Sequence, residues 1–340
     1  MKKLSILIPM YNSELCIEKC LDSVLNQNID EADVEILVMD DASTDSSVKF
    51  VKKYTQKYNN IILFPEEKMG VYAIRNKLLA LAKGDYIYFI DSDDYLIKGA
   101  LKIVLDLAIE NKLEGIGFKT LVVHNQDDSS SEKYLGSNIV VPKIQDGLSI
   151  IAFDERMRHE IWWYILKRDF LNRHNISFQE FPYSMDVMFT IKVFNYLKKF
   201  MYLQDSIYRY SSGPNSITKN SNKIHQAKLI ECQIKMISDL TLYINSIDLE
   251  LPNYYFIKNN LIFRRDVYTF FVIARMIKAK LSVHKVKDYI SLLKENDVYP
   301  LKHFIGKNYN TFKYKLLNFV FNKSWFLYTL MYFNRLLRKR

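Results

Sequence analysis

Short runs of apolar residues alternate with segments of helical periodicity along the first part of this chain. Four runs are rich in β-branched and aromatic residues, which is typical of strands buried on both faces: Leu4–Ile8, Val34–Met39, Ile61–Phe64 and Tyr86–Ile90. The segments between them carry apolar residues every three or four positions, as amphipathic helices do. This alternation predicts an α/β fold with a Rossmann-like, mostly parallel sheet flanked by helices.

Polar residues and glycines between these runs predict where the helices begin and end. Asn12, Ser13 and Glu14 supply N-cap and first-turn chemistry for a helix after the first run. Gly70 precedes a later helix, and Gly84 is expected to cap the carboxyl end of that helix. The sequence thus predicts helices that start within a few residues of the strand ends.

The pattern changes after the first third of the chain. Residues 115–124 predict a further strand, and the polar stretch 125–138 predicts an exposed loop. Amphipathic helices are expected over residues 224–293, with interruptions near Pro252 and Ala279. A C-terminal helical region therefore follows the α/β part.

Composition indicates a folded intracellular protein. The 340 residues are 49% hydrophobic and 25% charged, which is enough for a sizeable core. The N-terminus leads straight into the first apolar run without the pattern of a secretory signal, so we expect a cytoplasmic location. Cys16, Cys20 and Cys232 do not have the spacing of a disulfide framework, and we expect reduced thiols.

The net charge of +10 is concentrated at the C-terminus. Residues 301–340 contain nine Lys or Arg residues and no Asp or Glu, together with many aromatic residues. The apolar run 325–333 is too short to span the roughly 30 Å of membrane hydrocarbon. We predict that this basic, aromatic, amphipathic tail lies on the inner face of the cell membrane, and the alternative is that it packs on the protein's own core. A nucleic-acid partner is not expected, because acidic residues occupy the functional edge of the sheet.

Acidic residues follow two of the predicted strands at the point where each strand ends. Asp91, Asp93 and Asp94 come directly after the fourth apolar run, and Asp40 and Asp41 follow the second. The carboxyl ends of parallel strands share one edge of the sheet, where ligands bind in open α/β folds. Neighbouring carboxylates repel one another unless a divalent cation such as Mg²⁺ or Mn²⁺ neutralises them. The sequence therefore predicts a metal and nucleotide site here, and the alternative is that an acid of the cluster only caps a helix beginning near residue 96.

These acids belong to a series of motifs that resembles the family 2 glycosyltransferases. The motifs occur in the family's order: Ser5–Asn12, Asp40–Asp45, Gly70 with Arg75 and Asn76, Lys83–Tyr86, and Asp91–Asp94. They cover the first 120 residues, and weaker similarity continues to Thr218. The resemblance implies an inverting enzyme with the GT-A fold.

The resemblance also implies an order of functional segments along the chain. Residues 1–120 are expected to form the nucleotide-sugar-binding half of the GT-A domain, and residues 121–220 the acceptor-binding half. Residues 221–300 then form the helical region, and residues 301–340 the amphipathic tail.

Carried over position by position, the resemblance assigns roles around the nucleotide base. Pro9 and Tyr11 would line the base pocket, although Tyr11 is equally explained by packing. Asp41, rather than Asp40, would read a uracil-type edge. Arg75 would lie near the nucleotide, although a lone helical Arg is more often solvated or a salt-bridge partner.

The same resemblance divides the work within the acidic cluster. Asp91 and Asp93 form the family's Asp-x-Asp motif, in which Asp93 would contact the metal and Asp91 would hydrogen-bond the sugar or ribose. Asp94 would be a second metal ligand or a cap. The expected cofactor is a divalent metal, Mn²⁺ or Mg²⁺.

Inversion at an anomeric carbon requires a base that takes the proton of the acceptor hydroxyl. The family commonly places this base in a Glu-Asp pair beyond the metal motif, and the matching pair here is Met185-Asp186. Asp186 is therefore the predicted base, and Glu180 is a nearby substitute for the missing Glu. The alternative is that Asp186 is only an acid at the start of a helix.

The resemblance implies transfer of a sugar from a nucleoside-diphosphate donor, UDP-linked by family habit, to a glycan or lipid-linked acceptor in polysaccharide biosynthesis. One alternative is a catalytically inactive scaffold that binds nucleotide or glycan at the membrane. Its support in the sequence is Met185, which replaces the Glu of the family's Glu-Asp pair. Another is a sugar nucleotidylyltransferase, which is disfavoured because Pro9–Asn12 is not a Gly-rich phosphate loop.

Overall fold

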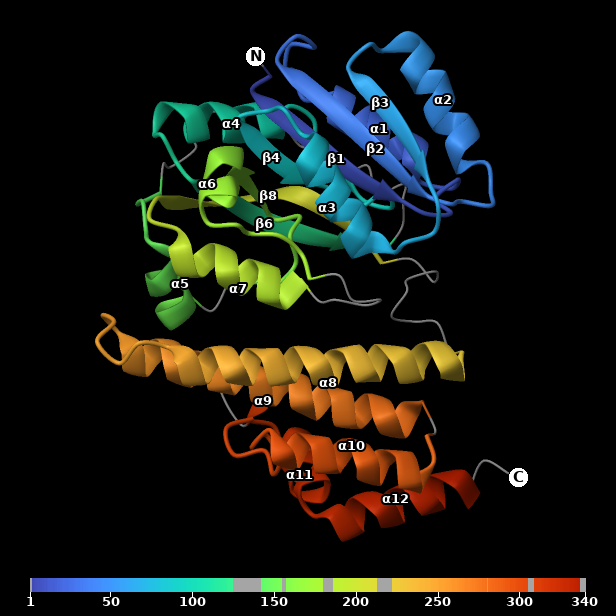
Figure 1. Cartoon of the computed structure of the whole chain (residues 1–340), viewed down its shortest axis with the longest axis vertical. Coiled ribbons are helices and arrows are strands. Elements are labelled where there is room, and N and C mark those ends of the chain that lie inside the picture. Colours follow the sequence, from blue (N-terminus) through green and yellow to red (C-terminus); the bar gives the residue numbers. More distant parts are fainter. Residues whose placement is uncertain are drawn as a thin grey trace. The chain divides into compact units, whose positions relative to one another are not determined.

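The structure is a computed structural model that describes residues 2–124, 142–154, 157–179, 186–212, 222–279, 281–304 and 309–336 (Figure 1). The proposed loop at 125–138 and the residues Glu180 and Met185 lie outside these ranges. The chain forms two compact units. The first comprises Met1–Ile150, Arg156–Pro182 and Phe189–Ser216, and the second Ile151–Glu155, Tyr183–Met188 and Ile217–Arg340.

The first unit is built on a sheet of eight strands in the order β3-β2-β1-β4-β7-β6-β8-β5. The strands are β1 Leu4–Met10, β2 Val34–Asp41, β3 Ile61–Glu66, β4 Tyr86–Phe89, β5 Tyr95–Leu96, β6 Gly115–Val123, β7 Tyr164–Lys167 and β8 Phe200–Ser211. The first four strands pair in parallel around β1, in the places where the apolar runs predict them. Every residue of β1 and β2 is buried, which explains why these strands read as continuous apolar runs.

The later strands add antiparallel pairs that the sequence pattern does not predict. β7 pairs antiparallel with both β4 and β6, and the two-residue strand β5 pairs antiparallel with β8. Residues 90–94 therefore connect β4, in the middle of the sheet, to β5 at its far edge. This connection is the acidic cluster, so the acids are held between two strands of one sheet.

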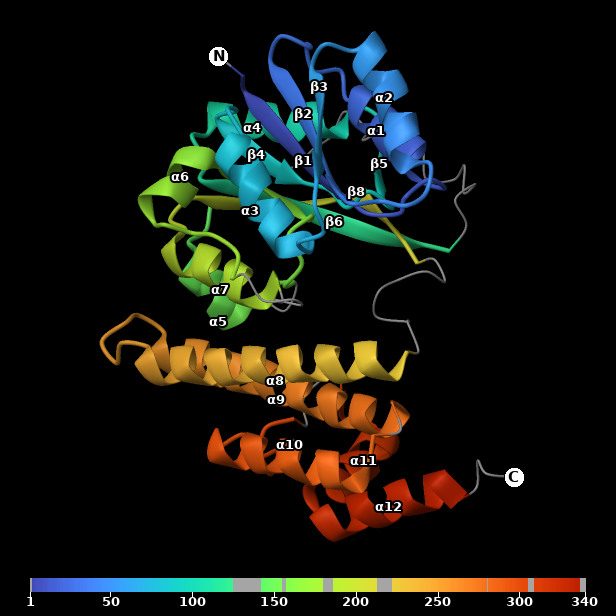
Figure 2. The same ribbon diagram turned by 45° about the vertical axis from the view of Figure 1, so that its right-hand side comes forward.

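Helices connect and cover these strands (Figure 2). They are α1 Ile17–Leu25, α2 Ser47–Lys57, α3 Val71–Leu81, α4 Ala100–Glu110, α5 Gly147–Phe153, α6 Arg168–Arg173 and α7 Asp186–Tyr196. Helix α3 packs on β1 and β2, whereas α2 packs on β3 and on α1. Because α3 follows Gly70, whose φ of 92° suits glycine, the predicted start of this helix is confirmed.

Two predictions about helix ends are wrong. Helix α1 begins only at Ile17, and no side chain caps it. The side chain of Asn12 instead accepts a hydrogen bond from the backbone N of Thr44, and the Ser13 hydroxyl pairs with that of Ser92. Gly84 does not cap α3, which ends at Leu81. A Cβ at Gly84 would lie 2.4 Å from the backbone N of Ser5, so glycine is required there for the close approach to β1.

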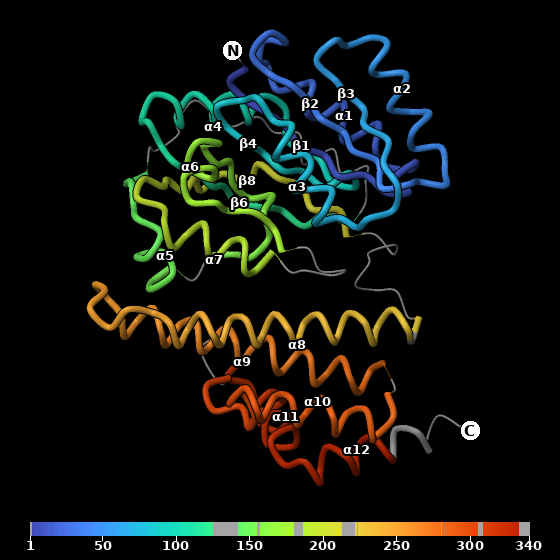
Figure 3. The backbone as a smooth tube through the Cα atoms, in the orientation of Figure 1, coloured from blue at the N-terminus to red at the C-terminus, as the bar shows by residue number. Residues whose placement is uncertain are grey.

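The second unit is helical (Figure 3). Its long helices are α8 Lys223–Ser246, α9 Tyr254–Lys278, α10 Val283–Glu295, α11 Phe312–Asn322 and α12 Ser324–Leu336. The breaks after α8 and α9 fall where Pro252 and Ala279 predict them. In the core of this unit, the rings of Phe270 and Phe304 stack with centroids 3.9 Å apart. No helix within the described ranges is long and apolar enough to cross a membrane.

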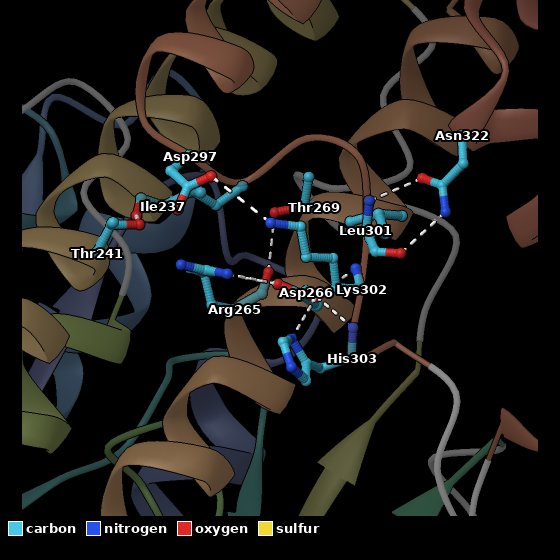
Figure 4. A network of polar contacts seen from close by, with 10 residues as sticks. All are labelled: Ile237, Thr241, Arg265, Asp266, Thr269, Asp297, Leu301, Lys302, His303 and Asn322. Atoms are coloured by element: carbon cyan, nitrogen blue, oxygen red, sulfur yellow. Dashed lines mark hydrogen bonds and ion pairs between the residues drawn. The ribbon is translucent and has the colours of Figure 1, made fainter.

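A buried carboxylate ties α9 to the segment after α10 (Figure 4). Asp266 is 1% exposed, and its Oδ2 accepts hydrogen bonds from the backbone N of Lys302 at 3.1 Å and of His303 at 2.8 Å. Its Oδ1 accepts a hydrogen bond from Nη2 of Arg265 at 2.9 Å. Both carboxylate oxygens are thus paired, as a buried charge requires.

Candidate functional site

Three loops at the carboxyl ends of β1, β2 and β4 are joined by hydrogen bonds. The backbone N of Asn12 donates to Ser43 Oγ at 2.9 Å, and that of Ser13 donates to Ser47 Oγ at 2.7 Å. The hydroxyls of Ser13 and Ser92 lie 2.7 Å apart and are both buried. These bonds link the loops that carry Tyr11, Asp41 and the acidic cluster, as expected for one sheet edge.

Asp40 and Asp41 are both buried but face different partners. Asp40 accepts a hydrogen bond from the backbone N of Ser43, which holds the turn after β2. Asp41 Oδ1 accepts bonds from the backbone N of Met69 at 2.7 Å and of Gly70 at 3.0 Å, and its Oδ2 lies 2.7 Å from Lys68 Nζ. Asp41 is therefore the acid directed toward the loop between β3 and α3, whereas Asp40 supports its own turn.

Pro9 and Tyr11 differ in exposure although they are two residues apart. Pro9 is buried at the end of β1, next to Met39 of β2. Tyr11 lies beyond the strand and is 47% exposed. Tyr11 is therefore not part of the core, and Lys68 Nζ lies over its ring, 3.0 Å from the centroid.

Arg75 reaches the acidic cluster from α3. Its Nη2 donates to Asp91 Oδ1 at 2.9 Å, and its side chain is only 5% exposed. The guanidinium carbon lies 5.3 Å from the ring centroid of Tyr72 and 5.6 Å from that of Phe178. Arg75 is a buried salt-bridge partner of Asp91 rather than a solvated residue.

Asp93 is the member of the cluster that is open to solvent. Partial burial of the carboxyl group, followed by the negative charge of Asp91, raises the pKa of Asp93 to about 6. Such a shift means that the charged carboxylate is unfavourable beside Asp91, which a nearby cation would relieve.

Asp94 is buried and bound on both oxygens. Tyr208 donates its hydroxyl proton to Asp94 Oδ2, and the backbone N of Ser211 donates to Oδ1 at 2.7 Å. Burial, followed by the charges of Asp93 and Asp91, raises the pKa of Asp94 to about 9. The alternative role as a helix cap is wrong, because residues 95–96 form β5 and α4 begins only at Ala100. Asp94 joins the acidic loop to β8.

Sequence reasoning did not assign Tyr208 or Ser211 to the site. Tyr208 is fully buried, and its ring stacks on Trp162 with centroids 4.5 Å apart and planes 6° apart. Trp162 and Trp163 are themselves buried and form part of the core. The weak family similarity at residues 207–210 was the available signal, but it did not reveal which acid Tyr208 would contact.

The donor set fits a divalent metal at Asp93. No group of three or more His, Cys, Asp or Glu side chains in the described part of the chain forms a ready metal cage. However, Mg²⁺ usually takes only one or two carboxylates together with phosphate oxygens. Asp93 is exposed and close enough to Asp91 to be perturbed by its charge, whereas both oxygens of Asp94 are engaged by Tyr208 and Ser211. This geometry favours Asp93 over Asp94 as the metal ligand.

Asp186 is the first residue of α7, a helix whose residues up to Met188 group with the second compact unit and whose remainder belongs to the first. An acid in the first turn of a helix is favoured by the helix dipole. The position therefore agrees with a helix-start role, and it is equally compatible with a base whose carboxylate is held at a helix N-terminus.

Comparisons with known proteins identify relatives of this chain. A family model described as Glycosyl transferase family 2 matches residues 5–179. Uncharacterized glycosyltransferase EpsJ of Bacillus subtilis is 28% identical over 218 residues, which cover 63% of this chain and 62% of EpsJ. The poly(ribitol-phosphate) beta-glucosyltransferase of Bacillus spizizenii is 43% identical over 123 residues, covering 34% of this chain and 19% of that protein. This chain thus spans less than two thirds of the length of these curated relatives.

A solved structure shares the fold. TarS residues 1–349 of Staphylococcus aureus, in complex with UDP, matches with a TM-score of 0.67 and 21% identity. The match covers 98% of this chain and 91% of that chain. It confirms the predicted fold class, a GT-A α/β sheet followed by helices.

Proposed function

Because this chain belongs to glycosyl transferase family 2, we propose that it transfers a sugar, with inversion, from a UDP-linked donor to a glycan or lipid-linked acceptor in surface polysaccharide synthesis. The observation that carries the proposal is the set of joined loops at one sheet edge, which bring together Tyr11, Asp41 and the Arg75–Asp91 pair. Two relatives support the proposal, because TarS was solved with UDP and the Bacillus spizizenii protein is a glucosyltransferase.

In this proposal, donor binding belongs to residues 1–120 and acceptor binding to residues 121–220. Tyr11 stacks on the base through the ring face over which Lys68 lies in this structure, and Asp41 accepts a hydrogen bond from a base N–H. Buried Pro9 forms part of the wall of the base pocket, and Arg75 orients Asp91 toward the sugar or ribose. Their buried or paired state supports these roles, since positioning groups must be held rigidly.

Asp93 would hold the divalent metal, Mn²⁺ or Mg²⁺. When bound, such an ion neutralises the diphosphate and stabilises its departure. Asp94 keeps the Asp93 loop in place through Tyr208 and Ser211. Asp91 contributes a second negative charge, which its pairing with Arg75 partly offsets.

Asp186 is proposed to act as the general base. The acceptor oxygen attacks the anomeric carbon from the face opposite the diphosphate, its proton passes to Asp186, and the bond from the carbon to the diphosphate oxygen breaks. This single displacement inverts the configuration and needs no covalent enzyme intermediate. Asp186 is the first residue of α7, where the helix dipole favours a negative charge.

A nucleotide-release assay over a panel of sugar nucleotides, with and without Mg²⁺ or Mn²⁺, tests the proposal. The wild type is expected to turn over at least one UDP-sugar only when metal is present. Asp93→Asn and Asp186→Asn are each expected to lose at least about 100-fold in turnover, as general-base and metal roles predict. Asp106→Asn is the matched control, because Asp106 is an exposed acid that pairs with Lys102 on α4.

The same assay separates the enzyme from a scaffold. Binding of UDP without turnover of any donor, in the presence of acceptor, would support the scaffold. Turnover that survives Asp93→Asn would remove the assigned metal role.

We also place the C-terminal tail at the surface of an anionic membrane, on the cytoplasmic side. One face of α11 and α12 packs within the second unit, where Phe321 and Leu327 are buried. The other face exposes aromatic and aliphatic side chains, namely Phe312, Leu316, Phe319, Trp325 and Tyr332. Lys313, Lys315 and Lys323 lie among them without any acid in residues 301–340. Exposed apolar side chains flanked by cations fit the headgroup region of anionic lipids.

Flotation with vesicles tests this placement. Leu316→Ser with Phe319→Ser is expected to release the protein from vesicles containing phosphatidylglycerol, while Leu242→Ser, at an exposed position on α8, is a matched control. Point variants are preferable to truncation after residue 310, which would strip buried Phe321 and Leu327 from the core. Equal flotation of the double variant and the wild type would refute the placement.

A further inference from the structure

Lys68 lies between the two residues that are proposed to hold the nucleotide base. It belongs to the connection between β3, which ends at Glu66, and α3, which begins at Val71. Its Nζ is 3.0 Å from the ring centroid of Tyr11 and 2.7 Å from Asp41 Oδ2. One ammonium group therefore contacts both at the same time.

The position of this ammonium excludes a stacked ring. A planar ring that packs on Tyr11 needs the space about 3.5–4.0 Å above the ring plane, which is the normal separation of carbon atoms in contact. Lys68 Nζ, at 3.0 Å from the centroid, already fills that space. A base and the ammonium cannot both lie on this face of Tyr11.

Lys68 also forms an ion pair with the Asp41 oxygen that does not bind the backbone amides. Asp41 Oδ1 accepts two backbone hydrogen bonds, from Met69 and Gly70, whereas the contact with Lys68 is made by Oδ2. A base N–H that approached Asp41 would compete with the ammonium for Oδ2. The lysine thus mimics both contacts of a base, the stacking contact and the hydrogen bond.

We propose that Lys68 is a displaceable gate of the base site, and that nucleotide binding requires its ammonium to leave the space between Tyr11 and Asp41. The inference rests on the proposed function, in which these two residues hold the base. The side chain of Lys68 is 53% exposed, so it can move into solvent without disturbing the core. Arg75, whose side chain is only 5% exposed, has no such freedom.

The gate lowers nucleotide affinity, because the free energy of the two Lys68 contacts is lost when the nucleotide binds. Displacement breaks one ion pair with an exposed partner and one exposed cation–π contact. Removing the ammonium is therefore expected to tighten nucleotide binding by about three- to thirtyfold, the range that two such contacts supply.

Calorimetric titration with UDP in the presence of Mg²⁺ tests the gate. Lys68→Met keeps the length of the side chain without its charge and is expected to bind UDP more tightly than the wild type. Lys68→Arg keeps the charge and is expected to bind no more tightly than the wild type. Lys77→Met is the matched control, because Lys77 makes an equally short 2.7 Å ion pair with Glu66 nearby and has a similar exposure of 46%.

Salt provides a second readout that a purely structural role would not change. At about 1 M NaCl the Debye length falls to about 3 Å, which weakens the attraction between Lys68 and Asp41. The affinity ratio between Lys68→Met and the wild type is therefore expected to shrink toward one. The ratio for the Lys77→Met control should stay near one at every salt concentration.

The outcomes separate the gate from the proposed function. If the wild type binds UDP and Lys68→Met binds it equally or more weakly, the gate is refuted and Lys68 is a bystander or a nucleotide ligand. If neither the wild type nor any variant binds UDP, the base site itself is refuted, and the gate with it. Tighter binding by Lys68→Met, with a ratio that falls in high salt, supports the gate.

Discussion

The hydroxyl of Tyr208 provides a direct test of what positions the acidic loop. Tyr208 is fully buried, donates its proton to Asp94, and stacks on Trp162. Tyr208→Phe removes the hydroxyl and leaves the ring, so the stacking contact is retained. The variant therefore isolates one hydrogen bond between β8 and the loop that carries Asp93.

The expected loss of stability follows from the burial of Asp94. The Asp94 side chain is 2% exposed, so water cannot easily replace the lost donor. An unsatisfied buried polar group costs about 1–3 kcal/mol. The bond from Ser211 N to the other oxygen remains, which favours the lower half of that range. At about 2–4 °C per kcal/mol for a unit of this size, Tm should fall by roughly 2–8 °C.

The loss of activity should exceed the loss of stability. A shift of about 1 Å in the Asp93 loop is enough for a loss of about 100-fold in turnover. UDP affinity should change much less, because Tyr11 and Asp41 lie at the ends of β1 and β2. Differential scanning fluorimetry, nucleotide release and UDP titration on the same preparation measure the three quantities.

The matched control is Tyr210→Phe. Tyr210 lies two residues further along β8 and also stacks on Trp162, with centroids 5.8 Å apart. The described part of the chain shows no hydrogen-bond partner for its hydroxyl. If Tyr208→Phe behaves like Tyr210→Phe and like the wild type in both Tm and turnover, the bond to Asp94 does not position the loop.

Three further predictions concern other contacts. Asp266→Ala leaves two buried backbone amides without an acceptor, and its free energy of unfolding, measured in urea, should be lower by about 2–5 kcal/mol. Asp288→Ala, which removes an exposed ion pair, should change the free energy of unfolding little. Arg75→Met leaves Asp91 without its cation and should lower turnover about tenfold or more in the nucleotide-release assay, since a charged hydrogen bond contributes about 1.5–3 kcal/mol. Chelation by EDTA should abolish turnover reversibly, with recovery on addition of Mn²⁺ or Mg²⁺, and unaltered turnover in EDTA would contradict a metal role for Asp93.

The strands of the donor half could be predicted from the sequence because they are buried on both faces. Continuous apolar runs such as Leu4–Ile8 and Val34–Met39 have the length of a strand and are too short for a typical helix. The acids that follow them were placed correctly at one sheet edge, since parallel strands end there together. The antiparallel pairs of β5 and β7 could not be predicted, because strands of two and four residues carry little periodic signal.

Polar residues near helix starts were the least predictable feature. The side chains of Asn12 and Ser13 have the chemistry of helix caps, but they bond to Thr44 and Ser92 in neighbouring loops. A side chain that can satisfy a local amide can equally satisfy one in a neighbouring loop. Gly84 was recognised as special for the wrong reason, since its role depends on the approach of β1.

By itself, the sequence determined which residues form the parallel strands, where their acidic ends meet, and to which family the chain belongs. These features depend on local apolar runs and on motifs of a few residues. Only the tertiary structure decided how Asp91, Asp93 and Asp94 differ, because their distinct partners come from other elements of the fold. Arg75 of α3 pairs with Asp91, and Tyr208 of β8, more than 100 residues further along, binds Asp94. Three identical carboxylates acquire separate roles through burial and neighbouring charge, and both arise only when the sheet assembles.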